Sequence, residues 1–263
     1  RELPQTAIDL DPRQKGTLVH TLFEHLIKKI QENQYSTEDV LIFLEAKRKE
    51  LNLYNNEEIF WKIQKNKFQN LAEKFFEFEK QRTTLFKSQT ETSFEIYFNT
   101  NTKTFSSRKN DTCFVIKGRI DRIDLNINKK YYLIYDYKSS AAQAFQYSKW
   151  LPEHQLQMFI YLLAVESTLT DSLKVQGTLY YLYKNFDTKK GLIEGEVAQS
   201  DFNYTKRVKS LATEEQIEKL KKEFIEFISS VFVKLEEGSF KTLPYKNTIC
   251  NDCDWKKLCR AQH

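Results

Sequence analysis

One aspartate and one lysine interrupt an otherwise apolar stretch near the middle of the chain. Residues 131–138 read Tyr-Tyr-Leu-Ile-Tyr-Asp-Tyr-Lys, a composition typical of a buried β-strand. Because side chains alternate between the two faces of a strand, Asp136 and Lys138 share one face and Tyr137 points to the other. Burying a carboxylate without a partner is costly, so Asp136 favours a functional site over a merely charged sheet surface.

A second β-rich stretch lies just before this one. Residues 113–125 contain Gly-Arg-Ile-Asp-Arg-Ile-Asp at positions 118–124, and the turn-like segment 126–130 separates the two stretches. This arrangement predicts a β-hairpin. On neighbouring antiparallel strands Asp121 can lie close to Asp136, so the hairpin brings two carboxylates and a lysine to one edge of a sheet.

Two carboxylates and an amine in one place suit a divalent cation and a phosphate. Mg²⁺ and Mn²⁺ prefer oxygen ligands, keep several waters and accept a substrate phosphate as a further ligand. Such a cation lowers the pKa of a bound water and neutralises charge on the phosphate in the transition state. Lys138 would orient the attacking water or stabilise the same charge. The combination predicts hydrolysis of phosphodiester bonds.

The spacing of apolar residues predicts helices first and strands later. Helical spacing follows start signals at Asp11-Pro12, at Ser36 and after Asn55-Asn56. Outside the hairpin, we expect strands over 92–99 and 175–184, and helices over 153–168 and from Ile217 to Leu235. The order predicts an α/β (α+β) fold in which helices flank a mixed β-sheet core.

The same pattern divides the chain into three parts. Residues 1–90 form an N-terminal helical part that carries His20, residues 91–240 form the core with the sheet, and residues 241–263 form a Cys-rich tail that packs back on the domain. No internal repeat or low-complexity linker separates them.

Bulk composition permits several functions and excludes a few. Lys and Arg total 41 against 36 Asp and Glu, and this surplus of +5 permits contact with phosphates without indicating nucleic acid. No apolar run is long enough to cross a bilayer and no signal peptide is evident, so we expect a cytoplasmic protein. The sequence lacks the Gly-rich phosphate loop of ATP-driven motors.

Three of the four cysteines crowd the C-terminal end: Cys250, Cys253 and Cys259. Thiolates at this spacing can hold an iron–sulfur cluster or zinc, and both need four ligands. A zinc-finger-like binding protein is therefore one alternative. The fourth cysteine, Cys113, lies in a predicted strand, where a small buried hydrophobic role is expected.

Taken together, these motifs resemble the RecB-family nucleases of the PD-(D/E)xK superfamily. Five matches follow in the family's order, from residue 16 to residue 259: Gly16-Thr-Leu-Val-His20, the run 118–124, Asp-Tyr-Lys-Ser from Asp136, Gln157-Met-Phe-Ile-Tyr161 and the cysteine trio. The resemblance implies a restriction-endonuclease-like fold with a Cys-containing C-terminal tail, and a metal-dependent deoxyribonuclease that uses Mg²⁺ or Mn²⁺.

The resemblance also implies roles for individual residues. The catalytic set would be Asp121, Asp136, Lys138, His20, Gln157 and Tyr161, and the metal ligands would be His20, Asp121, Asp136 and the backbone carbonyl of Tyr137. Gln157 and Tyr161 would line the active-site groove and touch substrate or Lys138. Two acids match less firmly. Glu24 would orient a neighbour, and Glu95 sits near a recurrent acidic strand position that an ordinary salt-bridged glutamate explains equally well.

The cysteines depart from the family pattern. In the family a fourth cysteine lies upstream of the helix that carries the histidine, and this chain has none there. Cys250, Cys253 and Cys259 are thus an incomplete set for a [4Fe-4S] cluster. Where present, such a cluster would staple the tail to the N-terminal helices rather than carry electrons.

The match is best to the C-terminal nuclease domain of AddB-type helicase–nuclease subunits. That implies cleavage of single-stranded DNA during double-strand break processing, with a helicase as partner. The alternatives are a standalone CRISPR-adaptation-type exonuclease and a catalytically idle DNA-binding module. Lys149, Trp150 and the segment 180–183 are candidate DNA contacts.

Overall fold

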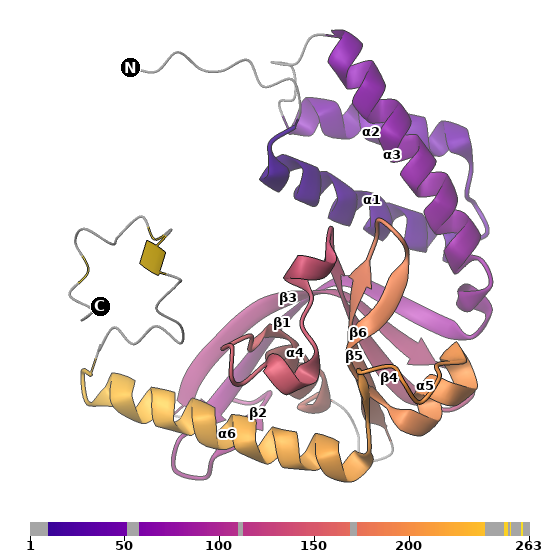
Figure 1. Ribbon diagram of the computed structural model, residues 1–263. Coiled ribbons are helices and arrows are strands. Elements are labelled where there is room, and N and C mark those ends of the chain that lie inside the picture. Colours follow the sequence, from indigo (N-terminus) through magenta and orange to yellow (C-terminus); the bar gives the residue numbers. More distant parts are fainter. Residues whose placement is uncertain are drawn as a thin grey trace.

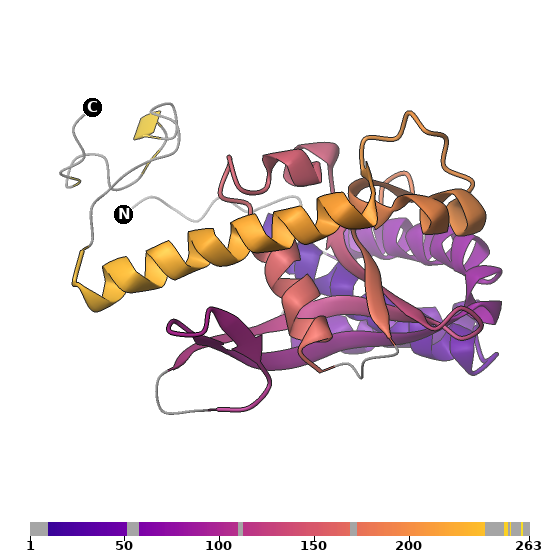
Figure 2. The same cartoon turned by 90° about the horizontal axis from the view of Figure 1, so that it is seen from below.

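A seven-stranded sheet forms the centre of the molecule, with helices on both faces (Figures 1 and 2). The computed structural model describes residues 10–51, 58–109, 113–168 and 173–239, together with residues 250, 251, 253 and 259. The strand order is β2-β1-β3-β4-β5-β6-β7. The strands are β1 (Phe86–Asn99), β2 (Thr104–Ser106), β3 (Cys113–Asn126), β4 (Tyr131–Lys138), β5 (Lys174–Leu182), β6 (Asp187–Glu194) and β7 (Leu211–Ala212). The predicted mixed sheet with flanking helices is confirmed.

Three N-terminal helices cover one face of this sheet: α1 (Pro12–Gln31), α2 (Thr37–Glu50) and α3 (Glu58–Glu79). Asp11 caps α1 in a capping box with Gln14, and Ser36 caps α2 by accepting from the Asp39 amide. These side chains satisfy amides that a helix start would otherwise leave unpaired. Both predicted starts are confirmed, whereas Asn55 and Asn56 lie outside the described residues.

The predicted hairpin is β3–β4, in which Asn126 pairs with Tyr131 across the turn. The helix α4 (Gln157–Glu166) then crosses over to β5, which lies parallel to β4. A parallel pair needs such a crossover, because a tight turn can only reverse the chain. The chain continues through β6, α5 (Gly195–Phe202) and β7 to the long α6 (Glu214–Glu236).

The alternation of side chains in the central strands builds two hydrophobic cores. Leu133, Tyr135 and Tyr137 of β4 pack with α1 and α3 in one core. Ile134 of the same strand packs with α4 and α6 in the other. The central strands are therefore buried on both faces, as the nearly continuous apolar sequence of β4 requires.

Several element boundaries differ from the sequence prediction. β1 begins at Phe86 rather than residue 92, and its first half is polar, which hid it from a search for alternating apolar residues. α4 begins at Gln157 rather than residue 153, because His154 has a positive φ of 53° that a helix cannot contain. β6 and α5 were not predicted. The division at residues 90 and 240 stays a prediction, and β1 runs through residue 90.

No helix in the described part of the chain is both long and apolar enough to cross a membrane.

Candidate active site

The two aspartates of the hairpin lie side by side near the end of the β3–β4 ladder. The last registered pair is Arg122 with Tyr135, and Asp121 and Asp136 come next on their strands. Asp121 Oδ2 accepts a hydrogen bond of 2.8 Å from the Tyr137 amide, which ties the two strands together just beyond the ladder. Asp121 is 8% exposed and Asp136 is 2% exposed. The sequence prediction that the two carboxylates meet therefore agrees with the structure.

Lys138 faces the same side as Asp136, as the strand period predicted. Its Nζ lies 2.6 Å from Asp136 Oδ2. This ion pair brings the lysine charge directly against a carboxylate that is 2% exposed. The lysine side chain remains 25% exposed, so its amine can reach a substrate at the mouth of the site.

His20 lies on α1 and approaches Asp121 from that helix. Its Nδ1 lies 3.4 Å from Asp121 Oδ1, and its ring meets Tyr137 edge to face with centroids 5.7 Å apart. The buried face of α1, which includes Val19, Leu22 and Phe23, packs against the sheet. His20 is thus held beside Asp121 by packing of its own helix neighbours.

Glu91 completes the cluster, and the sequence analysis did not single it out. Its Oε1 lies 3.9 Å from His20 Nδ1, and its Oε2 forms an ion pair of 2.7 Å with Arg119 Nε. Glu91 Oε1 is buried with no hydrogen-bond partner. Glu95, the acid considered from sequence, is instead exposed and paired with Lys117 at 2.6 Å. Glu24 pairs with Lys28 at 2.7 Å on the helix surface.

A local break in the β1–β3 ladder aims Glu91 at the site. Thr90 pairs with Arg122 and Thr92 pairs with Ile120, but the intervening residues Glu91 and Asp121 are not a registered pair. Glu91 has a φ of 49°, a left-handed conformation that costs a non-glycine residue roughly 1 kcal/mol.

The alternation of side chains changes at the same point in β3. Ile120 packs in the α4–α6 core, whereas Arg122, only two residues later, bonds Glu79 on the α3 side. In a regular strand, residues two apart share a face. The break therefore turns Asp121 and Glu91 toward each other.

The residues present fit a divalent cation. Ligand atoms of His20, Glu91 and Asp121 lie within 4.8 Å of one another, and this is the one such group among the described residues. A buried carboxylate oxygen without a hydrogen-bond donor, such as Glu91 Oε1, destabilises the fold unless a cation binds it. Hard carboxylate oxygens with one imidazole are a donor set that Mg²⁺ and Mn²⁺ accept.

Crowding of the acids also raises their pKa values, and a bound cation would lower them again. Burial raises the pKa of Asp136 to about 6, and the charge of Asp121 adds to this effect against the opposing pull of Lys138. Burial and the charge of Asp121 raise the pKa of Glu91. Burial alone would lower the pKa of His20, but the hydrogen bond and charge of Asp121 outweigh it, so that pKa is raised. The acids therefore lie close enough to disfavour one another's charged forms.

Gln157 and Tyr161 share one face of α4, as predicted, and form a relay toward β3. Gln157 Nε2 donates to the Tyr161 hydroxyl at 2.7 Å, and that hydroxyl donates to the Arg119 carbonyl at 2.9 Å. Burial raises the pKa of the Tyr161 hydroxyl, and the charges of Asp136 and Asp121 add to it, so the ring lies within electrostatic reach of the site. A direct role for either residue in catalysis stays a prediction.

Other residues proposed from sequence lie elsewhere. Trp150, Tyr180 and Tyr181 are no more than 2% exposed, so the structure contradicts the expectation that they contact DNA bases. Leu182 and Tyr183 of the same segment are 4% and 7% exposed. Lys149 is exposed and lies 3.5 Å from Glu153.

The cysteines form no disulfide; all four are among the described residues. Cys250, Cys253 and Cys259 do not belong to the group of metal-ligating atoms within 4.8 Å, so a cluster held by them stays a prediction.

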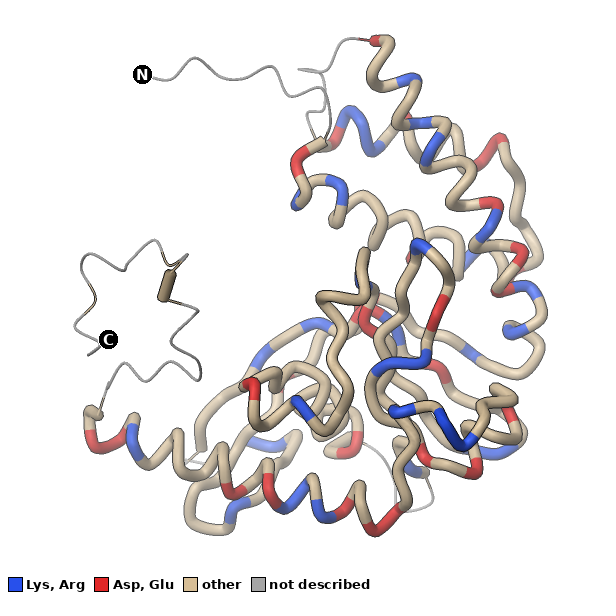
Figure 3. The backbone as a smooth tube through the Cα atoms, viewed as in Figure 1, with Lys and Arg blue, Asp and Glu red and all other residues tan. Residues whose placement is uncertain are grey.

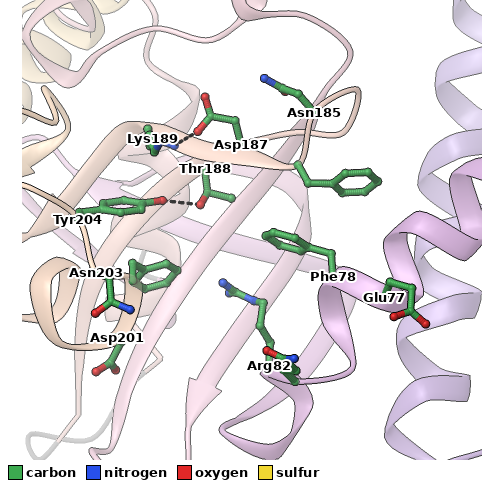
Figure 4. A pocket seen from close by; sticks show the side chains of 13 residues that line it. Glu77, Phe78, Arg82, Asn185, Asp187, Thr188, Lys189, Asp201, Asn203 and Tyr204 are labelled. Atoms are coloured by element: carbon green, nitrogen blue, oxygen red, sulfur yellow. Dashed lines mark hydrogen bonds between the residues drawn. The ribbon is translucent and has the colours of Figure 1, made fainter.

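A separate cavity of about 630 Å³ lies between the end of α3, the β5–β6 turn and α5 (Figure 4). Arg82 and Tyr204 point into it, and Thr188 and Tyr204 are hydrogen bonded at 2.5 Å on its wall. None of the catalytic candidates lines this cavity.

Comparison with known proteins shows the family to which the chain belongs. The chain is 26% identical to a subunit of the ATP-dependent helicase/deoxyribonuclease of Clostridium kluyveri (strain NBRC 12016), over 55% of this chain and 17% of that protein, so it spans less than a fifth of the relative's length. The crystal structure of SSO0001 aligns with 92% of this chain and 97% of its own at 16% identity and a TM-score of 0.31, a likeness too low to carry an argument. The model of the PD-(D/E)XK nuclease superfamily matches residues 1–260. This chain therefore belongs to the PD-(D/E)XK nuclease superfamily.

Proposed function

We propose that the protein is a deoxyribonuclease that hydrolyses phosphodiester bonds of single-stranded DNA with Mg²⁺ or Mn²⁺. One observation carries the proposal: three elements far apart in sequence, α1, β1 and the β3–β4 hairpin, bring the ligand atoms of His20, Glu91 and Asp121 within 4.8 Å of one another, with the ion pair of Asp136 and Lys138 beside them. Ordinary packing does not explain a buried acid cluster of this kind, because like charges destabilise one another in a partly buried site.

His20, Asp121, Asp136 and Glu91 would hold the cation, and the Tyr137 carbonyl is the further ligand that the resemblance implies. When bound, the divalent cation supplies Lewis acidity that activates water and neutralises charge on the phosphate. Lys138 supplies a compact positive charge at the mouth of the site, where it stabilises the developing phosphate charge. The Tyr137 amide fixes Asp121 Oδ2, which leaves Oδ1 to face His20.

The name of the similar Clostridium kluyveri protein guides the biological process that we propose for this chain. That protein is a helicase/deoxyribonuclease subunit, and this chain matches 17% of it. We propose that the domain works with a helicase that delivers one DNA strand to it during double-strand break processing in the cytoplasm. A [4Fe-4S] cluster on Cys250, Cys253 and Cys259 belongs to the same proposal and requires a fourth ligand from outside this set.

Cleavage of end-labelled single-stranded DNA tests the proposal directly. With Mg²⁺ or Mn²⁺ we expect shortening of the labelled strand, and chelation of the cation by EDTA should stop it. Lys138→Ala should lower the rate by about 10²-fold or more, because it removes a charge that acts on the transition state. Product ladders from 5′- and 3′-labelled strands would report the direction of digestion. Absence of cation-dependent products from every substrate would reject the function.

Substitution of Glu91 tests a site residue that the structure identifies and the sequence pattern does not. Glu91→Gln should weaken the apparent affinity for Mg²⁺ and lower the cleavage rate by about tenfold or more, because it removes a charge from the ligand group. Glu95→Gln, the same change four residues away on an exposed ion pair, should alter neither by more than about twofold. Cleavage rates measured across a Mg²⁺ titration decide between them, and equal behaviour of the two variants would remove Glu91 from the site.

A further inference from the structure

A second, smaller pocket of about 270 Å³ lies beside the catalytic centre, between α1, α3 and the end of β5. Its apolar wall is formed by Val19, Phe68, Leu71 and Tyr183. Val19, Phe68 and Tyr183 are between 1% and 7% exposed, so close packing holds these side chains in place. A pocket of this size, below the usual range for drug-sized ligands, suits one planar ring system.

Four lysines from three different elements surround this opening: Lys15, Lys67, Lys74 and Lys184. Figure 3 shows basic residues on each of these elements, α1, α3 and the β5–β6 turn. The lining contains no aspartate or glutamate, whereas the cavity of Figure 4 includes Glu77, Asp187 and Asp201.

These lysines also differ from others on the same helices. Lys28 on α1, Lys65 on α3 and Lys80, which directly follows α3, each form an ion pair with a glutamate. None of the four lysines around the pocket forms an ion pair with a carboxylate of the described residues. Their charge is therefore available to an anion outside the protein, next to an apolar opening.

The pocket is linked to the catalytic centre by one chain neighbour and one backbone hydrogen bond. Val19 precedes His20 on α1, and the Tyr183 amide donates to the Lys138 carbonyl at 3.2 Å. The Phe23 ring connects the two sites, since its centroid lies 5.0 Å from that of Tyr137 and 5.9 Å from that of Tyr183. The pocket therefore lies against the same helix and the same strand ends as the catalytic centre.

We propose that this lysine-ringed pocket receives an unpaired base of the DNA strand while the lysines bind the phosphates on either side of it. The proposal rests on the proposed nuclease function, which it deepens by assigning the origin of single-strand preference. A planar base fits against the apolar wall, and the positive charge of the four lysines suits the phosphates on either side of that base. A duplex cannot use the pocket unless it gives up a base pair, which disfavours it.

Equilibrium binding to the metal-free protein tests this subsite without any catalysis. Fluorescence anisotropy of a labelled oligo-dT is compared between wild type, the double variant Lys67→Glu/Lys74→Glu and the control Lys49→Glu/Lys62→Glu. The control makes the same charge change at two exposed lysines on α2 and α3 that do not line the pocket. We expect the pocket variant to lose affinity by about tenfold or more and the slope of log Kd against log salt to fall by about 0.7 per lysine. The control should stay within about threefold.

A second arm tests the base itself and does not depend on any variant. An abasic oligonucleotide of the same length should bind wild type about tenfold more weakly, because stacking of a base is lost. A blunt duplex should bind more weakly than the single strand, and free mononucleotide should compete poorly. Equal loss in the two double variants, equal binding of abasic and normal strands, or tighter duplex binding each overturns the proposal.

The two proposals fail in different ways. Cation-dependent cleavage combined with equal binding of the abasic strand would remove the subsite and keep the nuclease. The expected binding pattern in a protein that cuts nothing would keep the strand-binding pocket and remove the nuclease.

Discussion

Asp136→Asn should abolish DNA cleavage and, in metal-free buffer, make the protein more stable than wild type. The loss of activity should exceed about 10³-fold, because under the proposed function the substitution removes a charge that would hold the cation. The gain in stability has a separate origin. Asp136 is 2% exposed and lies beside a second carboxylate, so its charge is unfavourable until a cation binds.

The direction of the pH effect follows from the raised pKa. The carboxyl of Asp136 titrates with a pKa of about 6 in the folded protein, against about 3.9 when unfolded. Between these values the folded state holds the proton more tightly, so wild type loses stability as pH rises through this window and the full penalty applies above pH 6. Removing that charge should stabilise the metal-free protein at pH 7.5 by roughly 1–3 kcal/mol, and the gain should shrink as pH falls toward 4.

Thermal denaturation with and without Mg²⁺ measures both effects. The cation should raise the Tm of wild type toward that of Asp136→Asn, because a ligand that binds only the folded state stabilises it. Asp187→Asn is a suitable control: Asp187 accepts from the Lys189 amide at 2.9 Å outside the acid cluster, and an asparagine can accept the same bond. A variant that is less stable than wild type at pH 7.5 without metal would show that Asp136 contributes to folding rather than to function.

The sequence predicted the hairpin and its acids because local rules determine them. The apolar run 131–138, the turn at 126–130 and the strand period together fix which side chains of β3 and β4 share a face. The helix starts at Asp11 and Ser36 follow from capping, which is equally local. His20 required the resemblance, since nothing in the spacing of α1 reveals which strand it faces.

Glu91 could not be found by the same rules, because its position depends on a long-range feature. It lies in a polar half of β1 without apolar alternation, and its direction is set by a break in the ladder opposite Asp121. Glu91 could be identified only once the pairing of two strands was known. When β1 is aligned antiparallel to β3, the acid opposite Asp121 is Glu91 rather than Glu95. Trp150 and Tyr180 failed as DNA contacts for a related reason, since sequence shows aromatic character but not which rings fill a core.

A buried ion network on the α3 side of the sheet holds this arrangement in place. Arg122 follows Asp121 directly on β3, and its Nη2 donates to Glu79 Oε2 at 2.8 Å and to Asp124 Oδ2 at 2.8 Å. Glu79 Oε1 accepts from the Tyr181 hydroxyl at 2.9 Å, and Arg82 Nε lies 3.5 Å from Oε2. Glu79 and Asp124 are 0% exposed and Arg122 is 1% exposed. The buried Arg122 and the partly buried Arg82 thus neutralise two carboxylates that are fully buried.

Glu79→Ala should therefore destabilise the protein by about 3–5 kcal/mol, which corresponds to a Tm lower by roughly 10 °C. The substitution leaves the buried Arg122 and the partly buried Arg82 to share Asp124, and the cost of that uncompensated charge exceeds the loss of any single contact. Glu77→Ala makes the same change two residues earlier on α3, in a surface pair with Lys80, and should shift stability by no more than about 0.5 kcal/mol. Urea denaturation of both variants gives the comparison. Similar free energies of unfolding for the two would mean that water reaches the network, and the anchoring of β3 beside Asp121 would then have to come from the hydrophobic cores alone.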